Sequence, residues 1–280
     1  MAKQQGRHLG NYHFVYVTIV TVKIAEVIDQ LTDITSWARH TDSRLGFFAA
    51  LYRTVTIEVQ RGITEGRFEN PERMERLDVF FARRYLDAFA SYQAGRPIPR
   101  SWRVAFEAAT RWRPIILQHL LLGMNAHINL DLGIAAATVA PREALPSLRH
   151  DFDEINAILA GLIAAVEAEI GAVSPWIHLF STVGGDADNA LARFNVTIAR
   201  QVAWQVATNH ASLEADAQQS HLERVDLAAA LMARAILQPP LLTTAGLLLI
   251  RARETSTTAR VIDMLADVHP LPYAITRSVG

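Results

Sequence analysis

The chain has 280 residues, half of them hydrophobic and a fifth charged, with a formal net charge of −1 at pH 7. This length and composition fit a compact globular protein with a sizeable core and exclude wholesale disorder. Acids and bases are mixed along the chain, so no nucleic-acid surface is expected. Because the sequence has no cysteine, disulfides, thiolate metal sites and a cysteine nucleophile are excluded.

The apolar segments of the chain are not expected to cross a membrane. Residues 14–22 end at Lys23 without the small-residue cleavage site of a signal peptide. The run 117–134 carries polar side chains, and the run 227–250 is interrupted by Arg234 and two prolines, so neither is a continuous apolar span. We therefore expect a cytoplasmic protein with no integral membrane segment.

Helical periodicity dominates the chain, with apolar residues recurring at i, i+3 and i+4. Residues 1–20 stay open between a helix and an N-terminal arm, because 12–22 alternate as a strand would. Helices are predicted over residues 24–38, 45–62 and 71–92, from an N-cap at Ser101, over 114–134, 141–170, 188–213, 222–237 and 241–253, and just before His269. The sequence thus predicts an all-α fold, a single compact domain over residues 1–280 with a buried polar central helix.

The central helix is the most informative segment. Its apolar run LQHLLLGMNAHINLDLGI contains five polar residues, namely His119, Asn125, His127, Asn129 and Asp131. Taking an imidazole, an amide or a carboxylate out of water costs several kcal/mol unless the group finds a partner. At about 100° per residue, His127 and Asp131 share one face of the helix, and the two asparagines form a second pair roughly opposite.

Three interpretations of the first pair stay open. As a catalytic pair, Asp131 would fix the tautomer of His127, and the imidazole would move a proton. As metal ligands, H-x-x-x-D on a helix could chelate a divalent ion, with His119 or a distant acid completing the site. As a structural network, the His–Asp bond and the asparagines would only join helices.

Other polar residues lie in apolar helical surroundings. Asp78 is expected to bond to an arginine or a tyrosine, and Arg84 and Tyr85 lie within two turns of it. Arg193 could reach a buried carboxylate or an anionic substrate. Residues 150–153, which include a histidine and two aspartates, are expected to form a solvated turn.

Five segments together resemble one bacterial family. The central helix carries the pattern L-G-M-N-A-H-I-N-x-D-L, preceded by FFAALYRTVTIEVQRGI and ERMERLDVFFARRYLDAF and followed by FDEINAIL and ADNALARFNVTIARQVAW. From Phe47 to Trp204 they resemble the family named domain of unknown function 5995. The resemblance implies little about activity. It places eight residues at signature positions: Asp78, Tyr85, His119, Asn125, His127, Asn129, Asp131 and Arg193.

A more distant analogy is to zinc-dependent phospholipase C and related nucleases, which are all-helical and place ligands as H-x-x-x-D and H-x-x-x-E on core helices. The pairs His127/Asp131 and His210/Glu214 have these spacings. The remaining histidines are not spaced as that family needs, and no matching N-terminal tryptophan ligand is present. The second hypothesis is therefore a metal-dependent hydrolase that uses His127, Asp131 and His119 as ligands.

Our leading hypothesis is an enzyme with a buried interhelical pocket, acting by acid–base chemistry on a small, largely apolar substrate. Cyclisation, isomerisation or dehydration within bacterial secondary metabolism would fit. His127 would be the acid or base, Asp131 its orienter and His119 a further catalytic group. The expected substrate-binding residues are Asn125, Asn129, Tyr85, Asp78 and Arg193.

No cofactor is predicted, although the His and Asp pattern is compatible with a divalent metal. The sequence is also compatible with a homodimer. The third hypothesis is a non-catalytic binding or scaffold protein with a structural polar network.

Overall fold

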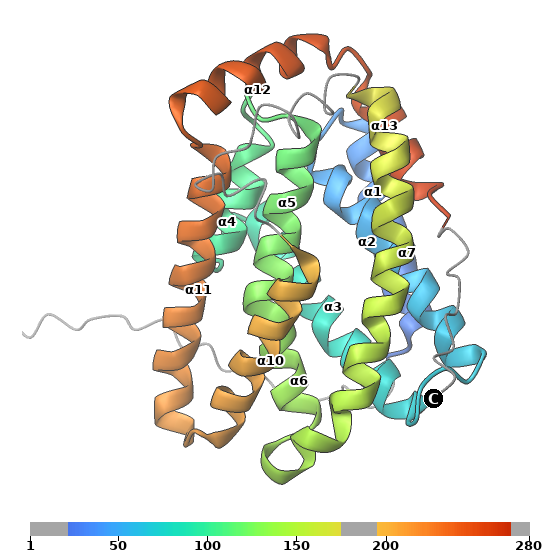
Figure 1. Cartoon of the computed structure of the whole chain (residues 1–280), viewed down its shortest axis with the longest axis vertical. Coiled ribbons are helices and arrows are strands. Elements are labelled where there is room, and N and C mark those ends of the chain that lie inside the picture. Colours follow the sequence, from blue (N-terminus) through green and yellow to red (C-terminus); the bar gives the residue numbers. More distant parts are fainter. Residues whose placement is uncertain (1–21, 175–194, 270–280) are drawn as a thin grey trace, which may run out of the picture.

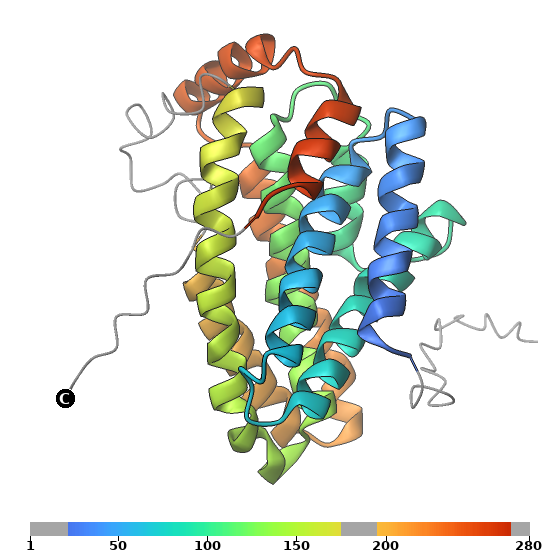
Figure 2. The same cartoon turned by 90° about the vertical axis from the view of Figure 1, so that its right-hand side faces the viewer.

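The computed structural model describes residues 22–174 and 195–269, which form an elongated bundle of helices packed around a central one (Figure 1, Figure 2). In chain order the elements are α1 (Ile24–His40), α2 (Leu45–Thr64), α3 (Pro71–Gln93), α4 (Arg100–Ala108), α5 (Ile116–Ala126), η1 (His127–Leu132), α6 (Gly133–Val139), η2 (Arg142–Leu148), α7 (Arg149–Val173), α10 (Val196–Ser212), α11 (Ala215–Leu237), α12 (Leu241–Arg253) and α13 (Thr258–Ala266). Within these ranges no residue is assigned to a β-strand, and the predicted all-α fold is confirmed.

The central helix is a continuous run of α5, η1 and α6, in which η1 is π-helical. Helices α2, α4 and α11 contact α5, while α10 contacts η1 and α6. Figure 1 shows this run in the middle of the bundle, with α12 lying across one end. The sequence predicts a regular α-helix here, because the apolar periodicity gives no sign of the π-helical turn. Such turns are frequent at functional sites.

Two glycines allow neighbouring helices to approach the central helix closely. A Cβ atom at Gly123 would overlap the ring of Phe48 on α2, and one at Gly133 would lie 2.5 Å from the backbone oxygen of Ala203 on α10. Real Cβ atoms do not approach other atoms so closely, so these two positions require glycine. The sequence thus encodes tight packing on two sides of the central helix.

Several predicted boundaries differ from the structure for local reasons. Helix α4 begins at Arg100, so Ser101 lies inside it rather than at its N-cap, and the hydroxyl of Ser101 donates to Asp226 on α11. The helix predicted from Pro141 begins as the 3₁₀ helix η2. Helix α11 begins at Ala215, earlier than predicted. The sequence pattern misses its first turns because they are polar and carry no apolar period. The segment 1–20 and residues 188–194 of another predicted helix lie outside the described residues.

Two described helical stretches are long and apolar enough to cross a membrane by length and composition, Ile116–Val139 and Arg142–Val173. In the first, 89% of the apolar window is buried inside the protein, and in the second 38% is buried. The first stretch is the central helix, and core helices of soluble proteins commonly pass this test. Its hydropathy is accounted for by the helices that surround it.

Candidate functional site

Asp131 on η1 is the centre of a buried polar site. Its side chain is 1% exposed and accepts hydrogen bonds from two other helices. Oδ1 accepts from Nε of Arg84 on α3 at 2.8 Å, and Oδ2 accepts from Nε1 of Trp102 on α4 at 2.9 Å. The Arg84 side chain is only 14% exposed, so its charge offsets part of the cost of burying the carboxylate. Asp131 therefore joins three helices as a hydrogen-bond acceptor.

His127 lies one turn before Asp131, and its Nδ1 is 3.3 Å from Asp131 Oδ2. Because the carboxylate only accepts, Nδ1 carries the hydrogen and donates it, which leaves a lone pair on Nε2. Burial lowers the pKa of His127, while the hydrogen bond and charge of Asp131 act in the opposite direction. The predicted contact between the two side chains is confirmed, and its geometry makes Nε2 the basic atom.

Aromatic rings enclose the imidazole of His127. Phe81 stacks on it, with ring centroids 3.5 Å apart and an interplanar angle of 8°. Tyr52 meets it edge to face at 4.4 Å. Further rings lie between 5.7 and 6.2 Å away. We call the whole set the aromatic cage, and its members are Phe48 and Tyr52 of α2, Phe81 and Tyr85 of α3, and Trp102 of α4.

Five buried polar atoms in or beside the aromatic cage have no hydrogen-bond partner among the described residues. They are Nε2 of His127 and of His119, the hydroxyls of Tyr52 and Tyr85, and Asp78 Oδ2. Burial raises the pKa of Tyr52, and the charges of Asp78 and Asp131 raise it further, which brings these groups into one neighbourhood. Burial also raises the pKa of Tyr85, so both phenols keep their protons and can donate. Each unpartnered buried group costs about 1–3 kcal/mol, so this cluster departs from an ordinary core.

Asp78 differs from its predicted arrangement. The sequence predicts a hydrogen bond to an arginine or a tyrosine of another helix. Among the described residues this bond is not formed, because Arg84 pairs with Asp131 and Asp78 Oδ2 has no partner there. Burial, followed by the charge of Glu75, raises the pKa of Asp78 to about 7. A carboxyl group that exchanges its proton near neutral pH is characteristic of functional sites.

His119 lies beside the aromatic cage rather than in it. Its ring packs edge to face against Phe47, with centroids 5.8 Å apart. It also lines a cavity of about 20 Å³ whose walls include three rings of the cage. Burial, followed by the charges of Arg44 and Arg251, lowers the pKa of His119 to about 3. The cavity has room for about one water molecule.

The asparagine pair faces another helix. Asn125 Nδ2 donates to the backbone oxygen of Ala229 on α11 at 2.8 Å, and Asn125 Oδ1 accepts from Asn129 Nδ2 at 2.9 Å. Asn125 is fully buried and Asn129 is partly buried. These bonds attach the central helix to α11, and the substrate contact expected of the two amides stays a prediction.

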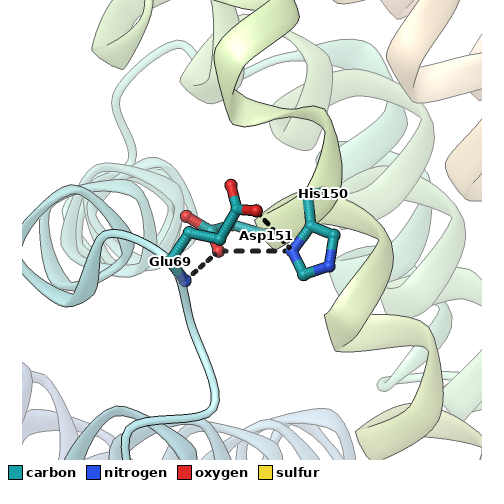
Figure 3. Close-up of side chains that lie close together, drawn as sticks. All are labelled: Glu69, His150 and Asp151. Carbon is teal, nitrogen blue, oxygen red and sulfur yellow. Dashed lines mark hydrogen bonds and ion pairs between the residues drawn. The ribbon is translucent and has the colours of Figure 1, made fainter.

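One set of three acidic and histidine side chains in the described ranges is close enough to share a metal ion, Glu69, His150 and Asp151 (Figure 3). Asp151 is buried, and its carboxylate accepts from the backbone N–H groups of Glu69 (2.7 Å) and Asn70 (3.2 Å) and from Arg73 (3.0 Å). The predicted solvated turn is therefore wrong at Asp151. With a guanidinium already on this carboxylate, we interpret the cluster as a tie between α7 and the start of α3.

The ligand set of the metal hypothesis is not brought together in the same way. His127, Asp131 and His119 do not form such a cluster among the described residues. Both oxygens of Asp131 already accept hydrogen bonds from Arg84 and Trp102.

The remaining predicted positions are Arg193 and the pair His210/Glu214. Arg193 lies outside the described residues. His210 faces His221, with their Nδ1 atoms 3.2 Å apart, while Glu214 is 85% exposed and contacts Arg142 at 3.4 Å. The second pair in the phospholipase analogy is therefore wrong, because its members turn to different partners.

Sequence analysis missed the residues that complete the site from other helices. In the sequence, Tyr52 and Phe81 fit the apolar faces of ordinary core helices, and Trp102 has no local signal. Arg84 offered one, since an arginine inside VFFARRY on an apolar face needs a buried acceptor.

Comparison with known proteins gives one family model. It matches residues 24–239, well over half of the 280-residue chain, and is described as a Family of unknown function (DUF5995). The matched range contains every element of the aromatic cage and the whole central helix. No curated protein and no solved structure matches the chain.

Proposed function

The chain belongs to this family of unknown function, and we propose that it is an enzyme that transfers protons to and from a small, largely apolar molecule. The observation that carries the proposal is the state of His127. Its Nδ1 bonds to Asp131, while its Nε2, inside the aromatic cage, has no hydrogen-bond partner in the described ranges. A histidine oriented by a carboxylate and free at its other nitrogen is the arrangement of a general base.

The neighbouring groups suggest how a proton would move. Nε2 of His127 takes a proton from the substrate, and the Asp131 carboxylate stabilises the imidazolium that forms. The hydroxyls of Tyr52 and Tyr85 donate hydrogen bonds to a substrate oxygen that gains negative charge. Asp78, which exchanges its proton near neutral pH, is suited to return a proton to the product. Isomerisation, cyclisation and dehydration all need only these steps.

The aromatic cage supports the choice of an apolar substrate. Its rings offer dispersion contact and exclude water, which strengthens the hydrogen bonds inside it. The adjoining cavity of about 20 Å³ is smaller than any organic substrate, so the cage rings must move apart to admit one. The cavity shares Phe48, Tyr85 and Trp102 with the cage, which makes it the natural start of that path.

Deuterium incorporation tests the proposal without a known substrate. An enzyme that moves protons on carbon exchanges substrate hydrogens with solvent, so mixtures of small apolar metabolites incubated in D₂O are analysed by mass spectrometry. We expect at least one compound to gain deuterium with the natural protein. We also expect the gain to fall by at least about a hundredfold with His127→Phe, which removes the base.

Two variants separate catalysis from folding. Tyr52→Phe removes a hydroxyl that has no hydrogen-bond partner among the described residues, so it should reduce exchange while leaving the unfolding midpoint nearly unchanged. His269→Phe changes an exposed histidine outside the site and should alter neither property. Equal exchange by the natural protein and a folded His127→Phe variant would refute the proposal. It would leave the structural-network hypothesis in its place.

A further inference from the structure

A second concave site lies away from the aromatic cage, between η2 and α10. It is an open cleft of about 770 Å³, a volume typical of small-molecule sites. Its apolar floor includes Leu145, Trp204 and Ala211, and its rim carries Arg142, Arg149 and Glu214. None of these residues takes part in the site around His127.

The two arginines of this cleft differ in how firmly they are held. Arg149 donates to Asp153 at 2.6 Å and lies over the Trp204 ring, with its guanidinium carbon 4.8 Å from the ring centroid. Arg142 is 62% exposed and has one ion pair, to Glu214 at 3.4 Å, whose side chain is 85% exposed. Pairs this exposed contribute little to stability, so Glu214 can be displaced from Arg142 at small cost.

The backbone at Arg142 is held in an uncommon conformation. Its φ is +50°, and the other non-glycine residue with positive φ among the described residues is Asp42. Aspartate tolerates this region through its short polar side chain, whereas arginine gains nothing locally from it. Strained backbone of this kind clusters at ligand clamps. At Arg142 this backbone conformation places the guanidinium on the rim of the cleft.

We propose that this cleft binds a small organic carboxylate with an apolar body. The carboxylate replaces Glu214 on Arg142 and forms charge-assisted hydrogen bonds with the guanidinium. The apolar body lies on Leu145 and Trp204. Glu143 and Glu214 balance the two arginines on the rim, so the cleft has no excess positive charge to attract a ligand with several negative charges. The proposal is independent of the chemistry assigned to His127.

The proposal is tested by isothermal titration calorimetry with naphthoate. Neutral naphthalenemethanol is the matched probe without a charge. Arg142→Gly removes the guanidinium and also relieves the positive φ, so the fold should be retained. We expect naphthoate to bind the natural protein at least about tenfold more tightly than the alcohol, and Arg142→Gly to weaken naphthoate by about tenfold to a hundredfold. Glu214→Gln frees Arg142 and should strengthen binding by about twofold to fivefold.

An exposed arginine elsewhere supplies the control. Arg103→Ala on α4 removes one positive charge far along the chain from the cleft and should leave naphthoate binding unchanged. The proposal is overturned if naphthoate does not bind, if the alcohol binds as tightly, or if Arg142→Gly binds as the natural protein does. Binding that survives Arg142→Gly but is lost in His127→Phe would place the ligand in the aromatic cage instead, and would also overturn it.

Discussion

The central helix presents two polar faces that differ in how completely their hydrogen bonds are satisfied. On one face, Asn125 bonds both to Ala229 of α11 and to Asn129. On the other, both oxygens of Asp131 accept hydrogen bonds. His127 Nε2 and the hydroxyls of Tyr52 and Tyr85 have no partners within the part of the chain that the structure describes. Both faces are i, i+4 pairs on one helix, so spacing alone does not separate them.

The difference shows what buried polarity is used for in this molecule. A polar group that joins helices reaches its best energy when every donor and acceptor is paired, as on the asparagine face. Groups left unpartnered lower stability, and native proteins keep such groups where a ligand or a reaction uses them. The asparagine face therefore attaches the central helix to α11. The histidine face attaches it to α3 and α4 through Asp131, and the proposed reaction takes place at His127.

The largest effect is expected from Asp131→Ala. This change leaves the nearly buried guanidinium of Arg84 and the indole N–H of Trp102 without an acceptor. Breaking a buried ion pair by removing one partner costs about 3–5 kcal/mol. Urea unfolding followed by circular dichroism should show a free energy of unfolding reduced by that amount.

The exposed pair on α3 is the matched control for Asp131. Asp87 lies 3.8 Å from Arg83, both side chains are about half exposed, and Asp87→Ala should cost less than about 1 kcal/mol. A similar small loss for Asp131→Ala would contradict its place as the centre of the site.

Asp78→Asn should have the next largest effect, and its sign should depend on pH. Burial raises the folded pKa of Asp78 from 3.8 to about 7, so between these values the native state holds a proton that the unfolded chain releases. The free energy of unfolding therefore falls as pH rises through this window. Asparagine cannot ionise, so the variant should be more stable than the natural protein by roughly 2–4 kcal/mol at about pH 8.

Comparison of the two proteins across pH isolates this group from other titrations. The stability advantage of Asp78→Asn should disappear as the pH falls below 3.8, the ordinary pKa of aspartate, because the group is then protonated in both states. Asp87→Asn makes the same substitution at an exposed position of the same helix and is the matched control. A difference between natural protein and Asp78→Asn that does not vary with pH would mean that Asp78 is hydrated or paired.

Most of the fold could be predicted from the sequence because each helix is marked by its own apolar period and breakers. Pro71 and the glycine and prolines of 95–99 bound α3 correctly, and α12 was predicted to the residue. The polar start of α11 has no apolar period, and the π-helical turn at His127 has no local sequence signal. Both depend on packing against other helices.

The candidate site could be predicted only along one helix. The contact of His127 with Asp131 follows from i, i+4 spacing, which is a local property. The partners of these side chains come from other helices. Arg84 of α3 and Trp102 of α4 donate to Asp131, and the Ala229 carbonyl of α11 accepts from Asn125. Partners separated by 29 to 104 residues depend on the tertiary fold, so a single sequence cannot assign them.

The smallest effect is expected from Asn125→Ala, which tests the asparagine face. The change removes two hydrogen bonds of a buried amide, one to the Ala229 carbonyl and one from Asn129, and should cost about 1–3 kcal/mol in unfolding free energy. Asn129→Ala removes one bond at a partly buried position and should cost less. If this face is only an attachment, both folded variants should keep the natural rate of deuterium exchange. Loss of exchange in a stably folded Asn125→Ala variant would reverse the comparison, because the asparagine face would then belong to the reactive part of the site.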